Sequence, residues 1–146
     1  MRPKFTEDQF TPMQEWYTAK DKAKLANDFV RFVLADFSYK LFTKTLYQHL
    51  SHMWGHIAHY NRGGFYDTWF RTDTKRLAFL KRCLTHPVYG DATYTRCDVE
   101  RILSNWIKEN GVVETLYAVV VKCTKEQEKS ELHRLAAKYP KEVYAN

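Results

Sequence analysis

The stretch "DVERILSNWIKENG", residues 98–111, carries the clearest helical pattern in the sequence. Its apolar residues recur at intervals of three and four, which puts them on one face of an α-helix. Asp98 is placed to cap the start of this helix, and Gly111 is placed to end it. The stretch therefore predicts a helix with one buried face, made of Val99, Ile102, Leu103, Trp106 and Ile107.

Similar spacing continues on the N-terminal side of this stretch. The chain has only five glycines and four prolines in 146 residues, and they lie mostly between the periodic segments. We expect helices near 12–20, over 21–36, over 38–62 and over 73–86. The sequence "NRGG" at 61–64 is typical of a helix stop, with a glycine in the left-handed position.

On the C-terminal side, the segment 112–121 is ambiguous because its β-branched valines also suit a strand. Its apolar residues fit a helical face better, so we expect a helix. Thr124 and Gln127 have capping-box spacing, which predicts a separate last helix that Pro140 stops. The fold class predicted is all-α: a single domain over residues 1–146, built as a bundle of about six helices with a long central helix that carries a histidine stripe.

Composition narrows the classes of partner. Lys and Arg number 23 against 17 Asp and Glu, and the resulting net charge of +6 favours an anionic partner. Three cysteines without a C-x-x-C pair suit a reducing compartment, and the N-terminal sequence lacks the apolar core of a secretory signal. No apolar run is long enough to span a membrane. We therefore expect a cytoplasmic protein that does not contact membranes.

The histidine stripe is the first candidate site. His49, His52, His56 and His59 follow intervals of three, four and three, so on a helix over 38–62 they fall within an arc of about 80°. Imidazoles at such spacing can share one ion, which suggests zinc or another transition metal as cofactor. The alternatives are that the stripe packs against a neighbouring helix or a second subunit, or contacts an anion.

The second candidate site is the basic and aromatic segment 60–96. Its cations outnumber its aspartates, and its rings could stack on unpaired bases while the cations neutralise phosphates. The competing interpretation is that the charged helix faces are merely solvated and the rings belong to the core. The residues predicted to contact nucleic acid are Arg62, Arg71, Lys75, Arg76, Lys81, Arg82, Arg96, Tyr66 and Trp69.

No catalytic signature is present: the sequence has no H-E-x-x-H, no phosphate-binding glycine loop and no cysteine-nucleophile motif. No catalytic residue is therefore assigned. The prediction is a small basic helical binding module that contacts nucleic acid or a nucleoprotein complex. One alternative is a metal-binding helical protein, with or without an enzyme activity, that uses the four histidines. A second is a structural subunit with the stripe at the interface of a homo-oligomer.

Overall fold

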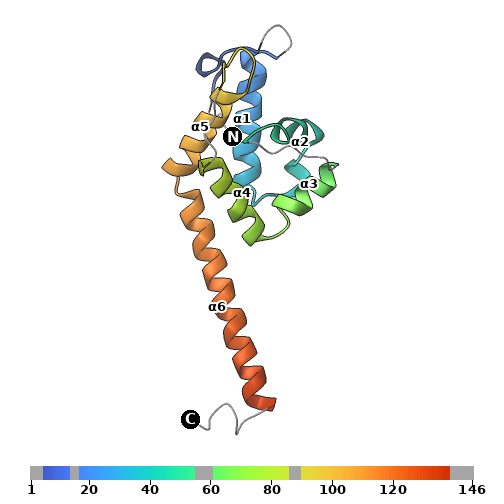
Figure 1. Cartoon of the computed structure of the whole chain (residues 1–146), viewed down its shortest axis with the longest axis vertical. Helices are drawn as coiled ribbons and strands as arrows, with labels where there is room; N and C mark the ends of the chain where they lie inside the picture. Colours follow the sequence, from blue (N-terminus) through green and yellow to red (C-terminus); the bar gives the residue numbers. More distant parts are fainter. Residues whose placement is uncertain (1–4, 14–16, 55–60, 86–89, 139–146) are drawn as a thin grey trace.

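The computed structural model describes residues 5–13, 17–54, 61–85 and 90–138. Within these ranges the chain forms six α-helices and two short 3-10 helices (η) and has no strand, which confirms the all-α prediction (Figure 1). The elements are η1 (Glu7–Gln9), α1 (Ala19–Leu34), η2 (Tyr39–Leu41), α2 (Lys44–Leu50), α3 (Arg62–Trp69), α4 (Asp73–Thr85), α5 (Cys97–Glu109) and α6 (Val112–Lys138).

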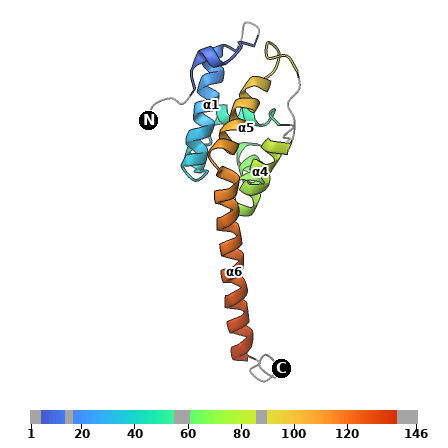
Figure 2. The ribbon, with the colours of Figure 1, turned by 90° about the vertical axis from the view of Figure 1, so that its left-hand side faces the viewer.

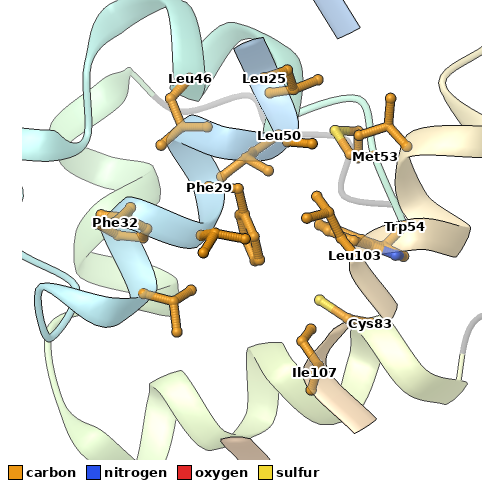
Figure 3. Close-up of a cluster of buried hydrophobic side chains, with 14 of the residues drawn as sticks. Leu25, Phe29, Phe32, Leu46, Leu50, Met53, Trp54, Cys83, Leu103 and Ile107 are labelled. Atoms are coloured by element: carbon orange, nitrogen blue, oxygen red, sulfur yellow. The ribbon is translucent and has the colours of Figure 1, made fainter. Parts of the chain in front are cut away.

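Helix α1 lies at the centre of the bundle and contacts η1, η2, α2 and α5. Its fully buried side chains Phe29 and Phe32 meet residues from α2, α4 and α5 in one apolar cluster (Figure 3). Aromatic rings dominate the side of the core next to α3: Phe32 packs edge-to-face on Phe70, with ring centroids 4.9 Å apart. Such ring pairs add about 0.5–1.5 kcal/mol each to the burial of apolar area.

The helix predicted first, now α5, has the expected apolar face, with Val99, Leu103 and Ile107 fully buried. Its predicted cap is wrong, because α5 begins at Cys97 and Asp98 lies inside its first turn. The predicted stop is confirmed, since Gly111 has a left-handed φ of 59° between α5 and α6.

The long central helix over 38–62 is wrong. α2 ends at Leu50, and the chain turns at Trp54, whose φ is +51°. Side chains from α4 and α5 hold the backbone of Trp54. Its N–H donates to the Glu100 carboxylate of α5, and its C=O accepts from Arg82 Nε of α4 at 3.0 Å. These side chains satisfy the backbone groups that a continuing helix would have used.

The "NRGG" sequence starts a helix instead of ending one. Asn61 is the N-cap of α3, and its Oδ1 accepts the Gly64 N–H at 2.7 Å. The chain is therefore helical over Arg62–Trp69, between two of the predicted helices. Asparagine is among the best N-cap residues, so the same four letters serve either end of a helix.

Two further boundaries differ from the prediction. Met13 and Tyr17 pair through a backbone bridge, and α1 begins only at Ala19, so the helix near 12–20 is wrong. α6 runs unbroken through the predicted cap at Thr124. The Thr124 hydroxyl donates to the Val120 carbonyl at 3.0 Å, which satisfies it without ending the helix.

Helix α6 leaves the bundle. Its first turns pack on the core through Val112, Val113 and Leu116, and it lies beside α4 and α5 there. The remainder of its 27 residues projects away from the other helices (Figures 1 and 2). Among the described residues, no helix combines the length and the apolar character that crossing a membrane would need.

A buried ion pair connects α1 with α5. Lys22 is fully buried, and its ammonium donates to Asp98 Oδ1 at 2.9 Å and to the carbonyls of Ala92 and Thr95 at 2.8 and 3.1 Å. Asp98 Oδ2 in turn accepts the Thr11 N–H at 2.9 Å. All three ammonium protons are used, as a buried charge requires.

Replacing Lys22 with Met should therefore lower the free energy of unfolding by about 3–5 kcal/mol, because the Asp98 carboxylate would stay buried without its cation. Urea unfolding followed by far-ultraviolet circular dichroism measures this loss. The matched control is Lys24→Met on the same helix, where the lysine is 69% exposed in a surface pair with Asp28 and should cost less than about 1 kcal/mol. Equal costs for the two variants would contradict the role given to Lys22.

Candidate functional site

The two rings predicted to stack on bases belong to the core. Tyr66 is buried, and its hydroxyl donates to the Phe37 carbonyl at 2.6 Å. Trp69 is half-buried, with its ring centroid 5.8 Å from that of Phe79. Both rings are therefore occupied by packing, as in the competing interpretation of this segment.

Three of the predicted cations hold the fold together. Arg76 donates to the Phe70 carbonyl at 2.7 Å and to Asp73 at 2.9 Å. Arg82 donates to the Trp54 carbonyl, as described above, and Arg96 donates to a histidine ring on α2. All three side chains are half-buried, so their charges satisfy internal acceptors before any ligand.

Another part of the predicted site lies beside an exposed ring that the sequence did not single out, that of Tyr39. The Arg62 guanidinium lies over this ring at 5.1 Å, and its Nε donates to the Tyr39 hydroxyl at 3.2 Å. Tyr39 packs edge-to-face on Tyr66, with centroids 4.9 Å apart, and the Arg71 guanidinium lies 5.2 Å from the Tyr66 ring. We call Tyr39, Arg62, Arg71 and Lys75 the basic corner.

One carboxylate lies within the basic corner. Asp67 accepts from Arg71 Nε at 2.9 Å, and its backbone carbonyl accepts from Lys75 Nζ at 2.8 Å. The corner and Asp67 together therefore have three cations and one carboxylate, and all four of these side chains are exposed. Lys81, the remaining predicted cation, lies apart from the corner, with its Nζ 5.7 Å from the Tyr117 ring of α6.

His49 and His52 do not lie on one helix, so the predicted stripe is interrupted between them. His49, in the last turn of α2, is half-buried, whereas His52 follows the helix and is exposed. His56 and His59 lie outside the described residues. Within the described ranges, no three His, Cys, Asp or Glu residues are grouped so that they could hold a metal ion, so the predicted zinc site gains no support there.

His49 packs as the alternative interpretation expects. Its ring lies against Tyr17, with centroids 4.7 Å apart, and its Nδ1 accepts from Arg96 Nε at 3.0 Å. The proton of the neutral imidazole is therefore on Nε2. Burial, and then the Arg96 charge, lower the pKa of His49 from 6.5 to about 4. Burial also raises the pKa of Tyr17 to about 12.

Cys83 does not have the environment of an activated thiol. Cys83, Cys97 and Cys123 are all unpaired, and the first two are buried. Burial raises the pKa of Cys83 well above its ordinary value, and the nearby Glu100 raises it further. A nucleophilic cysteine needs the opposite shift, so Cys83 has the character of a small core residue.

The shifted pKa of His49 predicts a pH-dependent stability. Between pH 6.5 and 4 the unfolded chain binds a proton at this residue while the native protein does not, so the free energy of unfolding falls as the pH drops through this window. His49→Gln should remove this component of the pH dependence, measured by urea unfolding at a series of pH values. His52→Gln is the control, because that side chain is exposed.

The role of Arg96 is tested in the same series. Arg96→Met should raise the pKa of His49, measured by NMR titration of the ring, because both a donor to Nδ1 and a neighbouring charge are lost. A His49 ring that titrates at an ordinary pKa in the unmodified protein would contradict the buried, neutral assignment.

The chain matches no family model, no curated protein and no solved structure. Among the residues predicted from the sequence, the structure brings Arg62, Arg71 and Lys75 together on one surface and uses Arg76, Arg82, Arg96, Tyr66 and Trp69 inside the fold. The basic corner is thus the candidate functional site.

Proposed function

We propose that this protein is a cytoplasmic binding module that contacts single-stranded nucleic acid, alone or within a nucleoprotein, through the basic corner. The observation that carries the proposal is the placement of two guanidinium groups on two adjoining rings, with Arg62 over Tyr39 and Arg71 over Tyr66. A phosphate backbone needs cations at the surface, and unpaired bases need an exposed ring. The corner offers both.

The rings reduce the cost of ordering the arginines. A guanidinium that already rests on an aromatic face loses less side-chain freedom when it binds a phosphate than one that moves freely in solvent. Tyr39 is itself 41% exposed, so part of its ring is accessible to a base. Tyr39 thereby takes the stacking role that the sequence analysis gave to Tyr66 and Trp69.

Asp67 opposes a phosphate but does not prevent its binding. The Arg71–Asp67 pair is exposed on both sides, with side chains 60% and 58% accessible, and exposed pairs contribute little to stability. A phosphate can therefore replace the carboxylate as the partner of Arg71 at little cost. Meanwhile the net charge of +6 draws polyanions to the protein as a whole.

The test is the triple variant Arg62→Ala, Arg71→Ala, Lys75→Ala, measured by fluorescence anisotropy with a labelled single-stranded oligonucleotide at low salt. We expect affinity to fall roughly tenfold or more and the slope of log K against log salt to decrease by about 2, since each phosphate contact on a single strand contributes about 0.7. Tyr39→Leu should weaken binding with little change in this slope, because it removes a stacking surface and no charge.

The matched control removes three exposed cations elsewhere: Lys20→Ala, Arg101→Ala, Lys108→Ala. It lowers the net charge by the same amount and should reduce affinity far less. Equal losses in the two triple variants would show that only net charge matters and would refute the basic corner as a site. No binding by the unmodified protein at low salt would refute the proposed function.

A further inference from the structure

Beyond its first turns, α6 has exposed apolar side chains with no partner element among the described residues. Its core-facing residues Val112, Val113 and Leu116 lie on one side of the helix. On the other side of the helix, Ala118 is exposed and Leu132, further along, is 54% exposed. A helix this far from the core gains little stability from the bundle, because helices in water are stabilised mainly by packing one face.

Six residues of α6 follow the 3–4 spacing of a coiled-coil seam. They are Ala118, Val121, Lys125, Glu128, Leu132 and Leu135, at intervals of 3, 4, 3, 4 and 3. At 100° per residue this seam is centred more than 90° away from the face formed by Val112, Val113 and Leu116. Its members are exposed or half-buried, so the seam is accessible on the outside of the helix.

The seam is complementary to itself when two copies run antiparallel. Two facing residues, one from each copy, then have residue numbers that sum to 253. Ala118 of one copy faces Leu135 of the other, and Val121 faces Leu132. The central layer places Lys125 of one copy opposite Glu128 of the other, and the twofold symmetry repeats this pair. Within the seam, every apolar residue meets an apolar residue, and every charge meets its opposite.

We infer that α6 is the interface of a homodimer, in which the α6 helices of two copies pair antiparallel about a twofold axis between residues 126 and 127. The parallel arrangement is disfavoured, because it would put Lys125 against Lys125 and Glu128 against Glu128. This interface is separate from the basic corner and does not depend on the proposed function.

The geometry leaves room for both bundles. The seam covers 18 residues, about 27 Å of helix, and an antiparallel partner places its own bundle at the opposite end of the pair. Figures 1 and 2 show α6, after its first turns beside α4, extending clear of the other helices. A two-helix contact of this length falls at the small end of specific interfaces, so we expect a reversible dimer.

Two lysines beside the seam oppose the inferred pairing. In this pairing Lys122 of one copy lies next to Lys129 of the other, and the repulsion occurs twice. We expect dimerisation to strengthen modestly as salt screens these lysines. Lys122→Glu converts both contacts into attractions and should tighten the dimer roughly tenfold.

Sedimentation equilibrium of the full chain over a range of concentrations tests the proposal. Glu128→Lys should weaken the dimer roughly tenfold, because the central layer then contains lysines from both copies. The exchange Lys125→Glu with Glu128→Lys should restore it, since the opposite charges face each other again. Circular dichroism of each variant checks that α6 stays helical.

An apolar pair of variants supplies the matched control. Leu132→Lys on the seam should abolish dimerisation, whereas Val119→Lys should not, although Val119 is also exposed, at 44%, on the same helix. Restoration by the charge exchange together with tightening by Lys122→Glu would establish the antiparallel dimer. A protein that remains monomeric at millimolar concentration, or equal effects of the two apolar substitutions, would overturn it.

Discussion

The buried charge of Lys22 is the constraint on which the bundle depends. A fully buried ammonium must be paired and hydrogen-bonded, and here its partners come from Asp98 and from the carbonyls of Ala92 and Thr95. Because Asp98 also accepts the Thr11 N–H, one pair of charges fixes α1, α5, the loop before α5 and the N-terminal segment against each other. Apolar burial alone is not directional and would allow these elements to slide.

The loop held by Lys22 carries Arg96 into position. From there the Arg96 guanidinium donates to His49 on α2 and lies 5.3 Å from the Tyr17 ring. Arg96, the N-cap residue of α5, thereby orders a neutral histidine. Glu100 and Arg82 likewise hold the backbone of Trp54: Glu100 accepts its N–H, and Arg82 donates to its carbonyl. Polar side chains thus hydrogen-bond the internal groups near helix ends. For this reason several cations that the sequence suggested as ligand contacts are structural instead.

The charged and apolar side chains that are not used inside the fold form the surfaces available to partners. The basic corner lies where η2, α3 and the start of α4 meet, and the seam lies on the side of α6 turned away from its core-facing residues. In the proposed dimer the two corners belong to bundles at opposite ends of an antiparallel helix pair. A long strand that contacts both corners would then bind with higher avidity than one that reaches a single corner.

The sequence by itself determined the helical class, because periodicity of apolar residues is a local property: α1, α4, α5 and the helical nature of Val112–Val121 follow from it. Only the tertiary structure decided where α2 ends, since the groups that hold Trp54 come from Arg82 and Glu100, far along the chain. For the same reason the sequence named Arg62, Arg71 and Lys75 but missed Tyr39. Charge can be read from the residue type, whereas the exposure of a ring is known only after the other rings have packed.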